Sequence, residues 1–341
     1  MNLSWVKKAG QGLLATALAS TLVTSLSVQA IDTPGKGVTV IPVKSSIAEV
    51  TFQTLLISRA LADLGFNVEK IRELEYPAAH VAIANGAGTF LADHWYPMHT
   101  DFYEKAGGDD KLFRSNVYSG GAFSGYLIDK KTADEYGITN IAQLKDPQTA
   151  KLFDTNGNGK ADLTGCPTGW GCEQIIEHHM GAYGLRDTVD HNQSPHSAMM
   201  ASTIARFNKG EPVLYYSWVP YWVSAVMKPG KDVVWLEVPF SSLPGEGGNE
   251  INTKLPDGSN YGFRVNTQRI VANKIFTDDN PAAKALFQAM NLSGEHISAQ
   301  NLAMRNGQDT DEDIAHHTDQ WIKANQGTYN RWLKTARAAS Q

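Results

Sequence analysis

Both cysteines of the chain lie in one short glycine-rich stretch, residues 165–172, with Trp170 between them. A loop of this length cannot bury an indole in a core of its own. If Cys166 and Cys172 join, the loop holds Trp170 on a rigid rim with exposed backbone N–H groups beside it. Aromatic faces attract cations, and free amides bind anions. The stretch therefore predicts a site for a small ligand with a positive charge at one end and a carboxylate at the other.

Two further tryptophans have a similar setting in different halves of the chain. Trp95 and Trp218 each follow a strand-like apolar run, and a proline stands two residues after each. A single tryptophan of this kind is better interpreted as core, but three in similar turns favour a shared aromatic box for a quaternary ammonium group. A site between two lobes would take one tryptophan from each strand end. The other aromatic candidates are predicted to pack in the core: Trp222, Trp235, Trp321 and Trp332.

The carboxylate end of the ligand has two sets of candidate donors. His99 lies four residues after Trp95, and if Pro97 starts a helix it points toward the same side and can donate to a carboxylate. A lone histidine is also typical of a surface or a satisfied core. The amides of Gly171 and Cys172 are the stronger candidates, because they fall at the expected start of a helix and helix starts bind anions.

A polar loop matches the first part of a calcium-binding loop. Its candidate oxygen ligands fall at positions 1, 3, 5 and 9, and glycine occupies position 6. These ligands are Asp154, Asn156, Asn158 and Asp162. Position 12 is Gly165, where such loops place a bidentate glutamate. A structural calcium ion and a polar turn held by its own Asx side chains both remain open.

Motifs of catalysis and of cofactor binding are weak. Residues 121–125 do not form a G-x-S-x-G elbow, because the serine is one place late. Gly86 and Gly88 lack the third glycine of a dinucleotide fingerprint. Adjacent histidines on a helix point about 100° apart, so the pairs at 178–179 and 316–317 do not form a metal face. We therefore expect no catalysed reaction and no cofactor other than the possible calcium.

The first thirty residues are predicted to be a cleaved signal peptide. Lys7 and Lys8 precede an apolar run over residues 13–28, and Val28-Gln29-Ala30 has the small-x-small pattern of a cleavage site. A membrane anchor is the alternative, but the run is short for a span. No cysteine stands nearby for lipid attachment. The mature chain would begin at Ile31, be soluble, and reside in an oxidising compartment.

Export and composition limit the remaining classes. Two cysteines close in sequence in an exported chain predict one disulfide, Cys166–Cys172, with two free thiols as the alternative. Without residues 1–30 the chain has 28 basic and 35 acidic residues, a net charge of −7, which argues against nucleic acid as a partner. Its 341 residues, 42% of them hydrophobic, are enough for two domains.

The order of the predicted elements indicates an α/β fold. A buried strand at 38–43, a helix ending near Gly65 and a strand at 67–74 form the opening of a parallel sheet. A third strand at 89–92 ends at the segment that carries Trp95 and His99, and ligands in open α/β sheets lie beyond such strand ends. Gly120 and Gly121 are interpreted as a flexible joint. Further strands are predicted at 124–130, 212–217, 233–238 and 264–272, followed by helices.

Five stretches give the chain a resemblance to a known family, the periplasmic glycine betaine/proline betaine-binding proteins (ProX) of ProU-type osmoprotectant ABC transporters. The resemblance runs from about Pro34 to the C-terminus. The stretches are Phe52-Gln-Thr-Leu-Leu, Tyr126-Leu-Ile-Asp-Lys-Lys-Thr-Ala-Asp, Asn140-Ile-Ala-Gln-Leu-Lys-Asp-Pro, Gly169-Trp-Gly-Cys-Glu and Lys231-Asp-Val-Val-Trp-Leu. The chain departs from the family pattern at Pro167, Thr168 and Gln174, which puts affinity in doubt more than ligand class.

The resemblance implies a fold, a ligand and a set of partners. It implies a two-lobe periplasmic substrate-binding protein of type II that closes on its ligand, acts as a monomer and delivers to an inner-membrane ABC permease and ATPase complex. It implies that Trp95, Trp170 and Trp218 box the quaternary ammonium. It also implies that His99 and the amides of Gly171 and Cys172 hold the carboxylate.

The combined interpretation is a binding protein without catalytic activity. Lobe 1 is predicted to comprise residues 31–121 plus 266–341, with lobe 2, residues 122–265, inserted into it. An exported enzyme acting on choline-like compounds is the first alternative, and it would need a nucleophile and a base beside the aromatic box. A surface adhesion module is the second, and it predicts no affinity for small molecules.

Overall fold

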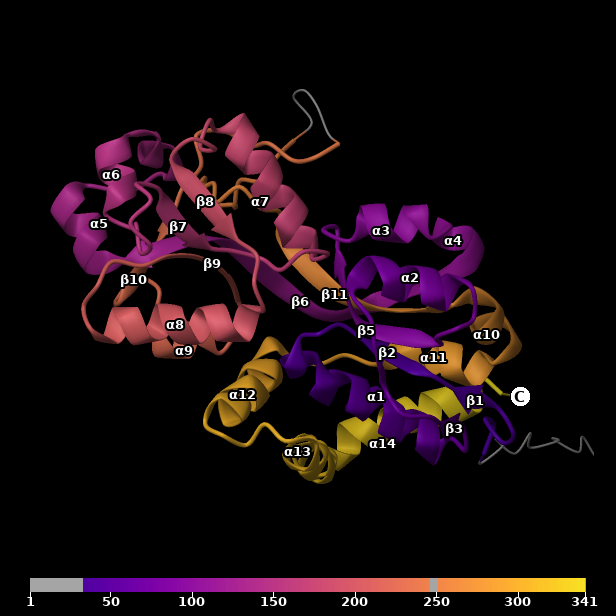
Figure 1. Cartoon of the computed structure of the whole chain (residues 1–341). Helices are drawn as coiled ribbons and strands as arrows, with labels where there is room; N and C mark the ends of the chain where they lie inside the picture. The colour runs from indigo at the N-terminus through magenta and orange to yellow at the C-terminus, as the bar shows by residue number, and fades with distance from the viewer. Residues whose placement is uncertain (1–32, 246–250, 341) are drawn as a thin grey trace, which may run out of the picture.

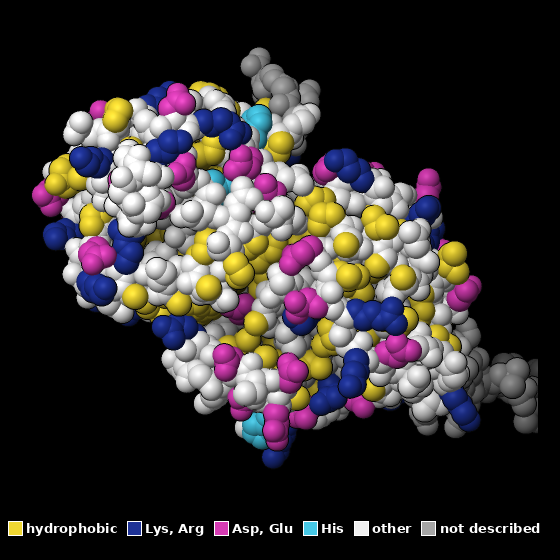
Figure 2. Space-filling model, in the orientation of Figure 1, with side chains coloured by type: hydrophobic (Ala, Val, Ile, Leu, Met, Phe, Trp, Pro, Cys, Tyr) yellow, Lys and Arg dark blue, Asp and Glu magenta, His cyan; other side chains and the backbone are white. Residues whose placement is uncertain are grey.

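The computed structural model describes residues 33–245 and 251–340. The predicted signal peptide, residues 1–30, lies outside the described residues. Within the described part of the chain, no helix combines the length and the apolar character needed to cross a membrane. Figure 2 shows Lys and Arg side chains interspersed with Asp and Glu over the face in view, without a continuous basic surface.

The chain forms two α/β lobes (Figure 1). The first lobe begins with β1 (Thr39–Val40), β2 (Pro42–Lys44), α1 (Thr51–Asp63), β3 (Asn67–Val68), β4 (Arg72–Glu73), α2 (Tyr76–Ala84), β5 (Phe90–Tyr96), α3 (Thr100–Lys105) and α4 (Gly108–Lys111). It ends with β11 (Asn266–Asn273), α10 (Lys274–Asp279), α11 (Pro281–Ala289), α12 (Gly294–Arg305), α13 (Asp311–Ala324) and α14 (Gln326–Ala338). Its helices pack a buried apolar cluster against the strands.

The second lobe is built by the middle of the chain. Its elements are α5 (Lys130–Tyr136), α6 (Pro147–Lys151), β7 (Ala161–Thr164), α7 (Gly171–Ala182), β8 (Val189–Asn192), α8 (His196–Asn208), β9 (Leu214–Val219), α9 (Val223–Val226) and β10 (Val233–Leu236). Short 3-10 helices lie at Ala48–Val50 in the first lobe and at Ile141–Lys145 in the second.

One long strand, β6 (Leu112–Asp129), connects the lobes. The large sheet has the order β4-β2-β5-β11-β6-β9-β7-β8, with β10 also paired to β6, while β1 and β3 pair separately. Strand β11 is antiparallel to both β5 and β6. The predicted lobe boundaries, 121/122 and 265/266, fall at the Ala122–Asn266 pair of this ladder. The residue at which one lobe gives way to the other stays a prediction.

Two local predictions were wrong. The expected joint at Gly120 and Gly121 is part of the continuous strand β6. The ladder with β11 skips one residue there, and Gly121 has φ +78°, so the glycines form a bulge rather than a break. The predicted strand at 67–74 is two short strands, because Asn67–Val68 pairs with β1 whereas Arg72–Glu73 pairs with β2.

The predicted core tryptophans are buried to different degrees. Trp222 is 7% exposed and Trp332 is 3% exposed. Trp321 is only partly buried and stacks on Trp332 with ring centroids 5.7 Å apart. Trp235 is also only partly buried, and its ring packs against Phe123 and Tyr261.

Candidate functional site

A cavity lies where the two lobes meet. All six residues predicted to bind a ligand line it: Trp95, His99, Trp170, Gly171, Cys172 and Trp218. Its wall also includes residues that the sequence did not single out, among them Tyr76, Met98, Tyr216 and Asn266. The structure therefore brings together three segments of the chain, and the first and the last of them are more than a hundred residues apart in the sequence.

The aromatic walls come from both lobes. Trp95 is the last residue but one of β5 in the first lobe, and Trp218 is the last but one of β9 in the second. Both tryptophans therefore lie within strands that were predicted to end before them. Trp170 and Trp218 meet edge to face, with ring centroids 6.2 Å apart and an interplanar angle of 68°. Tyr221 stacks behind Trp218 at 4.0 Å. The packing fixes the ring of Trp218, so the cavity has preformed aromatic faces.

The cysteine loop supplies a tryptophan and two amides at once. Cys166 and Cys172 form the predicted disulfide, with their Cα atoms 6.0 Å apart. Trp170 is the N-cap of α7, and Gly171 and Cys172 are its first two residues. The amides at these two positions have no acceptor within the helix, and both residues face the cavity. A helix start next to an aromatic wall can hold an anion.

Gly171 allows the lobes to approach closely at this point. A Cβ atom built on Gly171 would lie 2.6 Å from Cγ of Met98 and 3.0 Å from Cδ2 of His99. Both neighbours belong to the first lobe. Only a glycine at position 171 therefore permits the observed contact across the cleft.

His99 is a neutral hydrogen-bond donor in this site. It is the N-cap of α3 and only 1% exposed. Burial, and next the charge of His80, hold the pKa of His99 well below its usual value of 6.5. Its Nδ1 accepts a hydrogen bond of 3.2 Å from the backbone N–H of Trp95. The proton of the neutral ring is therefore on Nε2, where it can be donated to a ligand oxygen.

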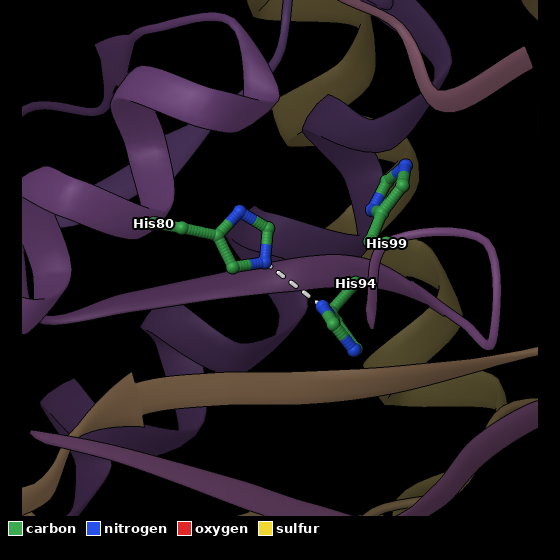
Figure 3. A group of neighbouring side chains, drawn as sticks. All are labelled: His80, His94 and His99. Atoms are coloured by element: carbon green, nitrogen blue, oxygen red, sulfur yellow. Dashed lines mark hydrogen bonds between the residues drawn. The ribbon is translucent and has the colours of Figure 1, made fainter. Parts of the chain in front are cut away.

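Two further histidines pack behind His99 (Figure 3). His80 Nε2 and His94 Nδ1 lie 2.8 Å apart, and His80 Nδ1 lies 2.6 Å from the carbonyl oxygen of Tyr76. Because Nδ1 of His80 must donate to that carbonyl, its Nε2 accepts from His94. Nitrogen atoms of the three rings come within 4.8 Å of one another. Two of the three lone pairs are engaged by N–H donors, since Nε2 of His80 accepts from His94 and Nδ1 of His99 accepts from Trp95. Only Nε2 of His94 has no hydrogen-bond partner, so we assign no metal here.

The polar loop between α6 and β7 is organised by its own side chains. Asp154 accepts hydrogen bonds from the amides of Asn156, Gly157 and Gly159. Asp162 accepts from the amide and hydroxyl of Thr155 and from the side chain of Asn156. Three of the four predicted oxygen ligands thus lie on this loop and the fourth, Asp162, is in β7 beside it, apart from the residues that line the cavity.

Sequence reasoning missed two buried polar residues next to the cavity. Asp93 and His196 are both buried, and His196 packs against both Trp170 and Trp218 at centroid distances of 5.4 and 5.2 Å. An acidic residue directly after the apolar run 89–92 was a usable signal for Asp93. His196 gave no signal, because its place against the two tryptophans depends on how α8 packs in the second lobe.

Comparison with known proteins places the chain in a family. Residues 38–324 match the family model described as the substrate-binding domain of ABC-type glycine betaine transport systems. The chain is 56% identical over 329 residues to the glycine betaine/proline betaine-binding periplasmic protein of Escherichia coli, covering 96% of this chain and 98% of that protein. It is 54% identical over 328 residues to the glycine betaine-binding periplasmic protein OusX of Dickeya dadantii, with the same coverage.

Solved structures share the fold at low sequence identity. Lactococcal OpuAC in a closed conformation with glycine betaine gives a TM-score of 0.65 at 19% identity, covering 87% of this chain and 99% of that one. A glycine betaine and L-proline-binding protein from Borrelia burgdorferi gives 0.68 at 17% identity, covering 89% and 100%. These similarities confirm the predicted fold class, a two-lobe α/β substrate-binding protein. The chain belongs to the family of substrate-binding domains of ABC-type glycine betaine transport systems.

Proposed function

We propose that this protein is the periplasmic substrate-binding component of an ABC importer and captures glycine betaine, proline betaine and related zwitterions for osmoprotection. The observation that carries the proposal is the cavity between the lobes, which combines aromatic walls with an anion-binding corner. Family membership supports transport and a periplasmic location, and both relatives named above are periplasmic.

The quaternary ammonium would be held by Trp95, Trp170 and Trp218. A trimethylammonium group cannot donate a hydrogen bond, and a carboxylate partner in direct contact with it would have to be desolvated. Tryptophan faces are already apolar, and each contributes roughly 0.5–2 kcal/mol to binding a cation. Three such rings supply several kcal/mol, which with a held carboxylate is enough for about micromolar affinity.

The carboxylate would be held by three neutral donors. These are Nε2 of His99 and the amides of Gly171 and Cys172, at the positions described above. His99 comes from one lobe and the amides from the other, so closure completes both ends of the site. Closure also excludes water from the pocket, and the closed form would then deliver the ligand, as a monomer, to a permease and ATPase complex in the inner membrane.

The alternatives derived from the sequence have less support. Membership of a transporter substrate-binding family does not support an exported enzyme acting on choline-like compounds. A surface adhesion module predicts no small-molecule affinity, and ligand-dependent thermal stabilisation separates it from the proposed function.

Calorimetric titration with glycine betaine, proline betaine, carnitine and choline tests the proposal. We expect tight binding of the first two. Changing Trp95, Trp170 or Trp218 to alanine should weaken betaine binding about tenfold or more. Trp321→Ala is the control, because that ring packs against Trp332 away from the cavity: it should change stability and leave affinity intact. Undiminished affinity in all three cavity variants would contradict the proposed site.

A further inference from the structure

A buried carboxylate without a charged partner lies directly behind the cavity wall. Asp93 is completely buried on β5, and Trp95 follows two residues later, so the two side chains leave the same face of the strand. Oδ2 of Asp93 accepts hydrogen bonds from the hydroxyl of Tyr76 at 2.6 Å and from that of Ser45 at 3.4 Å. Oδ1 has no hydrogen-bond partner. Tyr76 itself lines the cavity, so a single hydrogen bond separates the carboxylate from the wall.

The charges around Asp93 do not neutralise it. Among the residues that the structure describes, no salt bridge to Asp93 is formed. The charge of Lys44 acts on Asp93, but its Nζ is engaged with Glu73 Oε2 at 2.7 Å. The histidines packed near Tyr76, which are His80 and His99, have their pKa values lowered by burial and are neutral. A buried carboxylate that lacks a charged partner is costly to ionise, and burial raises the pKa of Asp93 to about 6.

We propose that Asp93 determines the charge specificity of the site, by supplying from behind Tyr76 and Trp95 the negative potential that favours a quaternary ammonium over an uncharged group of the same shape. This inference rests on the proposed function. Asp93 does not contact the ligand. It acts through Tyr76, whose hydroxyl donates to the carboxylate and whose ring thereby becomes more electron-rich. Because Tyr76 separates Asp93 from the cavity, no carboxylate has to be desolvated in direct contact with the methyl groups of the ligand.

The proposal predicts the direction in which betaine affinity changes with pH. Above the pKa of Asp93, the carboxylate is ionised and favours the cation. Below it, the group is protonated and that contribution is lost, so the affinity for glycine betaine falls on acidification. By linkage, a bound cation lowers the pKa of Asp93, and binding near pH 6 releases a proton. If ionised Asp93 strengthens binding tenfold, affinity at pH 5.5 should be about one third of that at pH 8, and about 0.4 proton should be released at pH 6.

Two ligands and two variants test this inference by calorimetry. Glycine betaine is compared with 3,3-dimethylbutanoate, which has the same shape and carboxylate but no positive charge, in buffers of different ionisation enthalpy. Asp93→Asn should reduce the preference for betaine about tenfold at pH 8 and abolish both the pH dependence and the proton release. Asp129→Asn is the matched control. Asp129 is also buried on a strand and accepts from the amides of Thr132 and Val213 in the second lobe, so its loss should affect stability only.

The wild-type protein alone also decides the question if Asp93→Asn does not fold. Betaine affinity should weaken from pH 8 to pH 5.5, whereas the affinity for 3,3-dimethylbutanoate, corrected for protonation of the ligand, should not. Tyr76→Phe removes the hydroxyl that stabilises the ionised carboxylate, so the midpoint should move to higher pH. Betaine affinity that is independent of pH, or that rises on acidification, would overturn the inference while leaving the proposed function intact. Absence of any betaine binding would overturn the proposed function itself.

Discussion

The absence of one methyl group at Gly171 permits the contact between the lobes. Gly171 is the first residue of α7, outside the helix interior in which alanine is more favourable than glycine by about 1 kcal/mol, so Gly171→Ala should leave the melting temperature nearly unchanged. Its Cβ would nevertheless collide with Met98 and His99 across the cleft. We expect betaine affinity to fall at least tenfold in a protein of undiminished stability, as measured by calorimetry and thermal unfolding.

A second glycine of the same helix provides the control. Gly181 also lies in α7, but a Cβ there would meet nothing nearer than Nε of Arg186 at 3.8 Å. Gly181→Ala should therefore leave affinity unchanged. Equal affinity in the Gly171 and Gly181 variants would mean that the close approach at Gly171 is not needed for binding.

Residue types with distinctive chemistry were predictable from the sequence, and their partners were not. Trp170 and Cys172 could be identified because tryptophan and cysteine in a glycine-rich loop have few other uses. The tautomer of His99 depends on the amide of Trp95, which only the turn after β5 brings into reach. Tyr76 had no visible signal, because its hydroxyl gains meaning only when α2 packs against Asp93.

At the scale of elements, the disulfide loop should matter more for binding than for folding. Closing a loop this short removes about 2–3 kcal/mol of unfolded-state freedom in the chain-entropy model. Its bond also fixes Trp170 and the first amides of α7. Reduction should therefore weaken betaine binding more than it lowers the melting temperature. The two quantities are measured with and without a thiol reductant, and unchanged affinity in reductant would contradict this role.

The polar loop before β7 gives a separate prediction. If Asp154, Asn156, Asn158 and Asp162 bind calcium, a chelator should lower the melting temperature while the folded protein still binds betaine, because these residues are not part of the cavity wall. Thermal unfolding with excess calcium and with chelator measures the difference. A melting temperature that does not respond to calcium would favour the self-contained polar turn, in which Asp154 is satisfied by amides alone.

Elements with strong local signals were predicted well, and those that depend on sheet pairing were not. The start of α7 and the apolar strands β5 and β9 follow from local patterns. The bulge at Gly121 could not be distinguished from a joint, because both require a glycine with positive φ and only the ladder to β11 tells them apart. The split between β3 and β4 likewise depends on their partners β1 and β2.

At the scale of the whole molecule, one side chain ties the lobes together beside the ligand cavity. Trp222 of the second lobe donates its indole N–H to Oε1 of Glu49 in the first lobe at 2.8 Å. The guanidinium of Arg305, on α12 of the first lobe, lies 5.2 Å from the centroid of the same indole. The described lobes are thus joined at a second place, away from the contact at Gly171, and this one is polar.

This contact should act on closure rather than on the ligand. Glu49 and Trp222 do not line the aromatic cavity, so Trp222→Phe removes the hydrogen bond to Glu49 and keeps an aromatic ring beneath Arg305. A hydrogen bond to a charged acceptor is worth about 1.5 kcal/mol, which corresponds to about a tenfold loss of betaine affinity if it is made only when the lobes are closed.

Because the open form receives the ligand, the association rate should hardly change and the dissociation rate should rise. Stopped-flow kinetics measures both rates. Lys284→Ala, which breaks an ion pair with Asp278 inside the first lobe, should change neither. An unaltered dissociation rate in Trp222→Phe would mean that this interlobe contact persists in the open form and contributes nothing to retention of the ligand.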